Sequence, residues 1–248
     1  MLDIFRFSEI AEAGEGVLNP LAEAKLDLLG EVLQLRSGTR VIDLGSGKGE
    51  MLCRYATRHG ISGTGVDIYP PFVERARARA NELGVSQAVT FHCGNGTDHV
   101  DQPSTYDVGM AIGTTWIGGG LLGTIDLLRT WTKPQALLAI GEVFWVDEPP
   151  PEVREIHDPR GEFGDLVGIL DRVEGHGLDL VEMLIASDDD WDRYQAGMWP
   201  NIIEWLDANP NDPIAEELRI RWKRNQRAYM LGARRCMGWG VFVLRPRT

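Results

Sequence analysis

Short apolar runs alternate with amphipathic segments over the first 146 residues. The apolar runs have the length and composition of buried strands and cover residues 40–44, 62–66, 88–92, 106–112 and 136–144. The segments between them repeat apolar residues at helical spacing, which predicts helices over 50–59, 70–83 and 121–131. Glycines at positions 60 and 84 provide the usual helix ends. The strands are continuously apolar and alternate with helices along the chain. This pattern predicts a parallel sheet covered by helices on both faces.

The pattern changes after residue 146. Prolines and acidic residues between 147 and 159 indicate a loop, followed by a predicted helix over 163–173, a sixth strand over 178–186 and a last strand over 237–244. A helical stretch with four tryptophans is predicted over about 188–233, and three aspartates at 188–190 suit its first turn. A further helical segment spans 20–35. We therefore expect one α/β core with helices before it and a helical insertion near its end.

Composition narrows the class of protein. The chain has 248 residues and a net charge of −12, which disfavours binding to nucleic-acid phosphates. Its longest apolar stretch, 136–146, contains Glu142 and is much shorter than the ~20 residues of a membrane span. The first residues lack the pattern of a signal peptide, and the three cysteines lack the spacing of a metal site. We expect a cytoplasmic protein without metal, membrane or nucleic-acid partner, as a monomer or homodimer.

The segment between the first strand and its helix carries the strongest chemical signal. It runs Asp43-Leu-Gly45-Ser-Gly47-Lys-Gly49, and its glycines allow a tight turn in which a ligand can approach bare backbone at a helix N-terminus. Asp67 ends the second strand, 24 residues after Asp43, where a carboxylate can accept both hydroxyls of a ribose. Together with a polar cluster after the third strand, these residues predict a nucleotide-cofactor site.

In these motifs the chain resembles the class I S-adenosylmethionine-dependent methyltransferases. The likeness rests on residues 41–50, 65–68, 106–108 and 140–142 and covers about 36–146; nearly the full length resembles uncharacterised bacterial members related to quinone-biosynthesis methyltransferases. The resemblance implies a Rossmann-like, doubly wound sheet of seven strands, mostly parallel with an antiparallel last strand. It also implies a single domain over 1–248, with a helical cap (1–35), a cofactor-binding core (36–146) and a substrate-side half (147–248) whose helical insertion forms a lid.

The resemblance also implies roles for individual residues. Gly45 and Gly47 would contact the methionine part of S-adenosylmethionine, Asp67 the ribose and Ile68 the adenine. The family usually has an aspartate after the third strand for the adenine amino group; this chain has Asn95, whose oxygen can accept that bond, and Asp98 is the alternative. The expected cofactor-binding set is Asp43, Gly45, Ser46, Gly47, Asp67, Ile68, Asn95 and Gly96. The product would be S-adenosylhomocysteine.

Two other functions compete with a methyltransferase. An NAD(P)-dependent oxidoreductase would carry G-x-G-x-x-G, but here Glu50 stands where its third glycine belongs, because the third glycine comes early, at 49. No tyrosine is followed four residues later by lysine, so the short-chain dehydrogenase pair is absent as well. A non-catalytic protein that binds S-adenosylmethionine or another metabolite is the second alternative, which the tryptophan-rich lid disfavours.

Substrate residues are expected just after the fourth and fifth strands, because ligands of parallel sheets bind at the carboxyl ends of the strands. Thr114 and Thr115 either orient the substrate or satisfy local backbone groups. Trp116 and Trp145 either form an aromatic wall beside a cation or pack against the lid. Tyr194, in the lid, is expected to help close the pocket against water.

Two residues are expected to act in catalysis. Glu142 is the first choice as general base or substrate anchor, although a carboxylate at a strand end can also be a structural hydrogen-bond partner. His99 follows the polar cluster after the third strand and is the second choice. The expected reaction is an in-line transfer of the methyl group onto an O, N, S or C nucleophile of a small molecule, in which positioning provides much of the rate.

Overall fold

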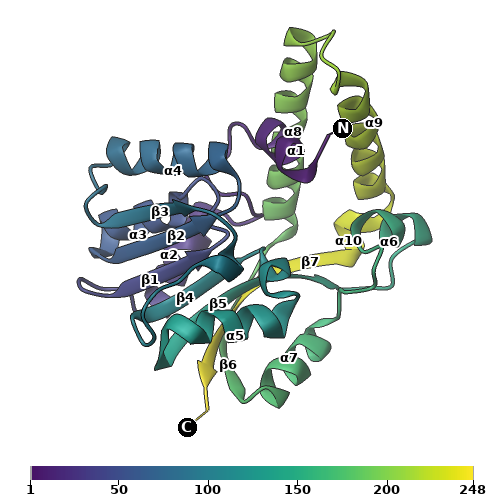
Figure 1. Ribbon diagram of the computed structural model, residues 1–248. Helices are drawn as coiled ribbons and strands as arrows, with labels where there is room; N and C mark the ends of the chain where they lie inside the picture. Colours follow the sequence, from purple (N-terminus) through teal and green to yellow (C-terminus); the bar gives the residue numbers. More distant parts are fainter. Residues whose placement is uncertain (1, 248) are drawn as a thin grey trace.

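A computed structural model describes residues 2–247 and contains one seven-stranded sheet with the strand order β3-β2-β1-β4-β5-β7-β6 (Figure 1). The strands pair in parallel from β3 to β5, whereas β7 pairs antiparallel with both β5 and β6. The expected mostly parallel sheet with an antiparallel last strand is confirmed. The strands are β1 (Arg40–Leu44), β2 (Ser62–Asp67), β3 (Val89–Cys93), β4 (Tyr106–Ile112), β5 (Thr132–Trp145), β6 (Leu178–Ile185) and β7 (Met237–Pro246).

Helices cover both faces of this sheet. On one face α2 (Glu23–Val32), α3 (Glu50–His59) and α4 (Pro70–Glu82) build a core with β1, β2 and β3. On the other face α5 (Leu121–Trp131) and α7 (Leu166–Gly175) pack on β4, β5 and β6. The side chains of Val41, Ile42 and Leu44 in β1 are fully buried between the two layers. Burial on both faces explains why the central strands are continuously apolar.

A third group of helices extends beyond the sheet. Between β6 and β7 the chain forms α8 (Asp188–Ala208), α9 (Ala215–Ala228), the π-turn η3 (Tyr229–Ala233) and α10 (Arg234–Cys236). The N-terminal helix α1 (Ile4–Ala11) lies beside α8, and Figure 1 shows these helices projecting from one end of the sheet. A separate apolar cluster that includes Phe7, Ile202 and Leu218 joins α1, α8 and α9. The helical insertion and N-terminal helices are therefore present as expected.

Several element boundaries differ from the sequence-based expectations: β5, for example, begins at Thr132 rather than at residue 136. Two differences concern helices after β5. The loop expected over 147–159 contains a short helix, α6 (Pro151–His157), which begins with proline at its first position, where proline is well tolerated. The helix expected from residue 163 begins three residues later. The Asp165 side chain accepts a hydrogen bond from the backbone N–H of Gly168 at 2.7 Å and so caps α7 at that point.

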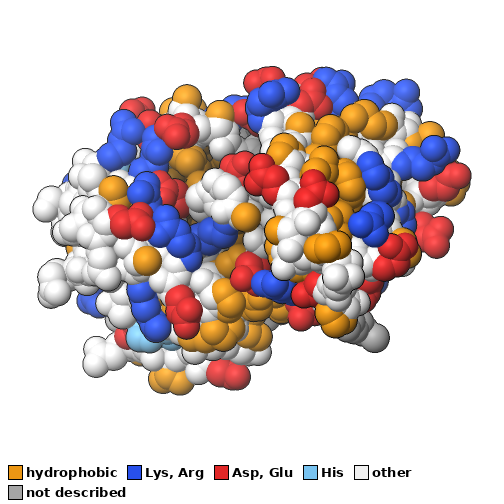
Figure 2. Space-filling model, turned by 90° about the horizontal axis from the view of Figure 1, so that it is seen from above, with side chains coloured by type: hydrophobic (Ala, Val, Ile, Leu, Met, Phe, Trp, Pro, Cys, Tyr) orange, Lys and Arg blue, Asp and Glu red, His pale blue; other side chains and the backbone are white. Residues whose placement is uncertain are grey.

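The described surface combines charged and hydrophobic side chains. Within residues 2–247, no helix is both long and apolar enough to cross a membrane. On the face drawn in Figure 2, basic and acidic side chains are interspersed, and hydrophobic side chains are exposed between them.

Candidate active site

The glycine-rich turn from β1 into α3 has the conformation that its glycines permit. Gly45, Gly47 and Gly49 all have positive φ angles, at 72°, 53° and 73°. A Cβ atom at Gly45 would lie 2.3 Å from the Thr114 side chain, so this position has no space for another residue. The turn therefore presents bare backbone at the carboxyl end of β1, as a ligand at the N-terminus of α3 would need.

Asp67, at the end of β2, is held against this turn. Its Oδ2 accepts a hydrogen bond from the Gly47 N–H at 2.8 Å, and its Oδ1 accepts one from the Tyr69 N–H at 2.9 Å. The side chain is buried, and burial raises its pKa against the opposing effect of these two bonds. Each carboxylate oxygen keeps a second lone pair, so the group can still accept hydrogen bonds from a ligand's hydroxyls.

Asp43 adds a second acidic group at the same place. Its Oδ1 is buried and has no hydrogen-bond partner among residues 2–247. Burial, together with the charge of Asp67, raises the Asp43 pKa to about 8. The buried hydroxyl of Ser46 also lacks a partner within the same range. Among the described residues no basic side chain pairs with either acid, and both lie next to open backbone. They therefore fit a ligand that carries both positive charge and ribose hydroxyls, as S-adenosylmethionine does.

One cavity of about 460 Å³ brings the predicted cofactor residues together. All eight line it, from the ends of β1, β2 and β3: Asp43, Gly45, Ser46, Gly47, Asp67, Ile68, Asn95 and Gly96. Asp98 does not line the cavity. Asn95 therefore occupies the position at which a contact with adenine is expected, although its Oδ1 also accepts from the Thr97 N–H at 3.1 Å.

The opposite wall of the cavity comes from the N-terminal segment, residues 4–19. Leu18 lies over the glycine turn, since a Cβ atom at Gly47 would be 3.1 Å from its Cδ1. Asn19 donates a hydrogen bond to the carbonyl oxygen of Ile112, at the end of β4, at 3.2 Å. Lys48 donates to the carbonyl oxygens of Glu12 and Glu15 at 2.5 and 2.9 Å. The N-terminal segment is thus fastened across the carboxyl ends of the strands.

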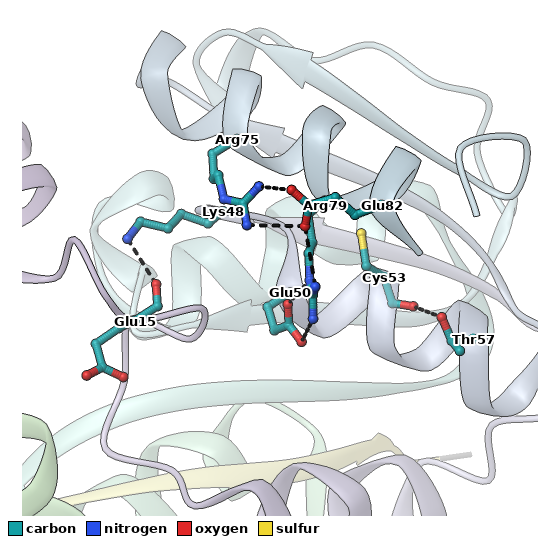
Figure 3. A network of polar contacts seen from close by, with 8 residues as sticks. All are labelled: Glu15, Lys48, Glu50, Cys53, Thr57, Arg75, Arg79 and Glu82. Atoms are coloured by element: carbon teal, nitrogen blue, oxygen red, sulfur yellow. Dashed lines mark hydrogen bonds and ion pairs between the residues drawn. The ribbon is translucent and has the colours of Figure 1, made fainter. Parts of the chain in front are cut away.

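Figure 3 shows how the glycine turn is tied to the neighbouring helices. Lys48 points toward Glu15, while Glu50 at the start of α3 receives two hydrogen bonds from Arg79 of α4, at 2.6 and 3.1 Å. A smaller hollow of about 290 Å³ lies among Lys48, Glu50, Arg79 and the N-terminal segment. Its acids and bases largely pair with one another, which favours a structural role for this network.

Glu12 and Tyr194, which are 182 residues apart in the sequence, meet in the wall of the cavity. Glu12 follows α1 and Tyr194 belongs to α8; the Tyr194 hydroxyl hydrogen-bonds the Glu12 carboxyl group and lies 3.1 Å from the Leu18 carbonyl oxygen. Burial raises the pKa of Glu12 to about 7 and that of Tyr194 far above its usual range. Tyr194 lines the cavity from the helical insertion, as the sequence predicts, whereas Glu12 was not anticipated.

The residues expected to bind substrate divide into two groups. Trp116 lines the cavity and exposes 55% of its surface, so it can contact a bound molecule. Thr114 also lines the cavity, but its hydroxyl donates to the Leu44 carbonyl oxygen at the end of β1 at 2.7 Å, a bond that joins the ends of two neighbouring strands rather than a local turn. Thr115 does not reach the cavity and begins the short 3₁₀ helix η2 (Thr115–Gly118).

Trp145 does not have the predicted position of a substrate residue. Its side chain is buried outside the cavity, where the indole Nε1 donates to the buried Asp158 carboxylate at 3.2 Å and the ring packs on Phe163. This corrects the aromatic-wall interpretation for Trp145. The antiparallel pairing of β5 with β7 continues through Trp145, so the strand extends past the point at which the sequence placed its open end.

The two predicted catalytic residues also lie outside the cavity. Glu142 sits within the β5–β7 pairing, and burial raises its pKa, while a hydrogen bond with the Thr115 side chain opposes that rise. His99 packs edge-on against Trp131, with Nε2 3.9 Å from the Asp101 carboxylate, and burial lowers its pKa. Neither side chain lines the space that would hold a substrate, so neither is placed to act on one.

Sequence reasoning missed the N-terminal side of the cavity. The lining residues from this segment are Ile4, Phe5, Ser8, Glu12, Gly16, Val17, Leu18 and Asn19. A signal for α1 was present, because Asp3 is a typical N-cap and Phe7, Ile10 and Ala11 share one buried face. No local pattern indicates that this helix packs on α8, about 190 residues away, and so bounds the site.

These features define an α/β protein with a cofactor site at the carboxyl ends of its strands. Residues 35–161 match the family model for a methyltransferase domain. The chain is 43% identical, with a TM-score of 0.93 over the whole of both chains, to an S-adenosylmethionine-dependent methyltransferase from Geobacter sulfurreducens solved with S-adenosyl-L-homocysteine. It is 41% identical to the uncharacterized protein YjhP of Escherichia coli over 99% of this chain and all of that one.

A more distant relative matches about half of the chain. The 27-O-demethylrifamycin SV methyltransferase of Amycolatopsis mediterranei is 30% identical over 123 residues, 50% of this chain and 45% of that protein. The chain belongs to the class I S-adenosylmethionine-dependent methyltransferases. It is an enzyme of that family, with the cofactor after which the family is named, and the oxidoreductase and non-catalytic alternatives are set aside.

Replacement of Asn95 tests which residue after β3 contacts the adenine. We expect Asn95→Ala to weaken binding of S-adenosylhomocysteine roughly tenfold, the effect of one lost hydrogen bond of about 1.4 kcal/mol. Asp98→Ala is the matched control, because Asp98 is three residues away and outside the cavity. Isothermal titration calorimetry gives both dissociation constants, and a larger effect of Asp98→Ala would reverse the assignment.

Proposed function

We propose that this enzyme transfers the methyl group of S-adenosylmethionine to a small molecule held in the same cavity. The observation that supports this most directly is the joint lining of one cavity by the eight cofactor residues and by Tyr194, Trp116 and the N-terminal segment. Cofactor and acceptor would thus share a space from which the N-terminal segment excludes water. A volume of about 460 Å³ is within the range of small-molecule sites.

The cofactor supplies a methyl group activated on a sulfonium sulfur, so the protein has to bind, orient and keep water away. Gly45 and Gly47 would present backbone to its methionine part, with Asp43 opposite its positive charge. Asp67 would accept the ribose hydroxyls, while Ile68 and Asn95 would contact the adenine. Holding the acceptor in line with the methyl carbon and sulfur would provide much of the rate enhancement.

The acceptor atom is an O, N, S or C nucleophile in this proposal. The name of the Amycolatopsis relative indicates methylation of an oxygen, which favours oxygen here as well. Apart from the cofactor residues, apolar side chains such as Phe5, Phe72 and Trp116 outnumber polar ones on the cavity walls, which suits a compact and largely apolar molecule.

Calorimetric titration tests the ligand class directly. Purified protein titrated with S-adenosylmethionine, S-adenosylhomocysteine and NADH is expected to bind the two sulfur compounds at micromolar concentration and NADH not at all. Protein that already carries either compound from its expression host is unfolded and refolded before titration, and mass spectrometry of the denatured extract identifies what was bound. Binding of NADH alone, or of none of the three after refolding, would contradict the proposal.

A further inference from the structure

Among the described residues, 2–247, Glu12 is the only carboxylate lining the main cavity that neither belongs to the expected cofactor site nor forms an ion pair. Four carboxylates line the cavity. Asp43 and Asp67 lie at the glycine turn, and Glu50 is bound twice by Arg79. The Glu12 side chain faces the cavity from the N-terminal segment, across from the glycine turn, and only 4% of the residue is exposed.

The groups around Glu12 leave its charge without a direct counter-ion. The hydroxyls of Tyr194 and Ser8 hydrogen-bond its carboxyl group. Lys48 is the nearest cation, but its ammonium group donates to the backbone carbonyls of Glu12 and Glu15 and attracts the carboxylate only at a distance. Glu15 opposes that attraction. Burial outweighs these effects and raises the Glu12 pKa to about 7, so the group can gain or lose a proton near neutral pH.

The hydrogen bonds of Tyr194 suit a carboxyl group that changes its protonation state. Its hydroxyl has one proton and two acceptors within reach, the Glu12 carboxyl oxygen and the Leu18 carbonyl oxygen. When Glu12 is ionised, Tyr194 can donate to it. When Glu12 is protonated, it can donate to the Tyr194 oxygen while Tyr194 donates to Leu18. Either state is hydrogen-bonded without movement of heavy atoms.

We propose that Glu12, oriented by Tyr194, accepts the proton of the methyl acceptor, and that this acceptor is a small, mainly apolar molecule that reacts through a phenol or enol hydroxyl. The inference rests on the proposed methyl transfer and deepens it. It makes Glu12 a catalytic residue that touches the substrate, and Tyr194 a positioning residue that acts through Glu12.

The transfer balances with a hydroxyl acceptor. The acceptor oxygen gives its proton to the Glu12 carboxylate and forms a bond to the methyl carbon. The carbon–sulfur bond breaks, and its electron pair stays on sulfur. The negative charge of Glu12 and the positive charge of the sulfonium disappear together, so the reacting groups are left neutral after the transfer. The proton leaves Glu12 to solvent after the product departs.

Other acceptor classes fit these residues less well. An ammonium group would bring a second positive charge beside the sulfonium. A carboxylate acceptor would be repelled by Glu12 and needs no base. A thiol would be neutral, but sulfur is a weak hydrogen-bond partner for the hydroxyls of Ser8 and Tyr194. A phenol or enol hydroxyl both donates to Glu12 and accepts from its neighbours.

A panel of matched acceptors tests the proposal. The full-length protein is incubated with methyl-labelled S-adenosylmethionine and one candidate acceptor at a time. The acceptors are phenols, anilines and thiophenols built on the same rings, together with enolic 1,3-diketones. We expect label in the hydroxyl compounds. Glu12→Gln should lower kcat on them at least about 100-fold, the contribution of a general base. Because glutamine can still accept from Tyr194, the dissociation constant of S-adenosylhomocysteine should stay within about twofold of the parent value.

A second readout concerns the proton itself and needs no turnover. In the unliganded protein, ¹³C NMR of glutamate carboxyl groups should show one resonance titrating near pH 7, as the pKa of Glu12 indicates, and Glu12→Gln should remove it. Tyr194→Phe should move that midpoint upward, since the lost hydrogen bond favours the ionised form.

The pH dependence of turnover is a third readout. The kcat of the parent enzyme should rise with pH to a plateau above about 7, and the midpoint of this rise should shift upward in Tyr194→Phe. Glu31→Gln, the same change at an exposed position of α2 outside the main cavity, is the control.

The outcomes separate this inference from the proposed function. Failure of the parent protein to bind S-adenosylhomocysteine contradicts the proposed function itself. Binding with no methylation of any hydroxyl compound, or with methylation of amines or thiols in preference, overturns the hydroxyl proposal alone. Glu12→Gln that keeps the parent turnover and pH profile overturns the role of Glu12. Loss of turnover in Glu12→Gln together with an unchanged NMR titration also overturns it.

Discussion

Asp67→Ala is expected to weaken binding of S-adenosylhomocysteine at least 100-fold, a loss of about 2.7 kcal/mol or more. The variant removes the carboxylate that would accept two ribose hydroxyls, and hydrogen bonds to a charged group contribute about 1.5–3 kcal/mol each. It also removes the acceptor for the N–H groups of Gly47 and Tyr69, which hold the glycine turn in place. Isothermal titration calorimetry on parent and variant measures the effect.

Asp107→Ala is the matched control for this prediction. Asp107 lies near the start of β4, at the end of the strands opposite to the cofactor cavity. There it pairs with Lys133 and accepts a hydrogen bond from the Arg40 N–H. Its removal deletes an acid with comparable partners but should leave the dissociation constant unchanged. Equal binding by Asp67→Ala and the parent protein would show that Asp67 has no part in holding the cofactor.

The cofactor half of the cavity was predictable because each of its residues belongs to a local signal. A glycine turn follows a strand, and the carboxyl ends of parallel strands meet at one edge, so Asp43, Asp67 and Asn95 had to lie near one another. The parallel pairing of the first five strands and the limits of α5 followed from the same alternation of apolar and amphipathic segments. Local chemistry and strand order were sufficient here.

The acceptor half was not predictable in the same way. Its wall depends on packing between α1 and α8, and the Glu12–Tyr194 contact spans 182 residues. Glu142 and Trp145 follow the rule for parallel strand ends, but β5 continues as an antiparallel partner of β7 through both residues. Because β7 comes last in the chain, its effect on the end of β5 appears only in the folded structure.

The third glycine of the turn, Gly49, belongs to a local sequence motif and also takes part in packing between distant segments. In the dinucleotide-binding pattern the third glycine, one position later, allows a helix and a strand to pack closely. Here Gly49 meets that need from another position: a Cβ atom on it would lie 2.6 Å from the Phe91 ring in β3 and 2.7 Å from the Ala76 Cβ in α4. The spacing of Gly49 argued against an NAD(P) site, and its close packing explains why the residue is glycine.

Gly49→Ala is therefore expected to lower the free energy of unfolding by about 2–5 kcal/mol. A left-handed backbone costs an L-residue roughly 1–2 kcal/mol, and overpacking a core typically costs about 1–3 kcal/mol. Both apply to Gly49, which has a φ of 73° and close neighbours on two sides. Urea-induced unfolding followed by tryptophan fluorescence and circular dichroism gives the free energies for parent and variant.

Gly84→Ala separates the two contributions. Gly84 has a similar φ of 69°, but a Cβ atom there would meet nothing within 4 Å, so only the backbone cost of about 1–2 kcal/mol should remain. The difference between the two variants then measures the close packing of α4 and β3 on the glycine turn. Equal losses in both variants would mean that Gly49 is required for its backbone conformation alone, and that the packing around the turn can accommodate a methyl group.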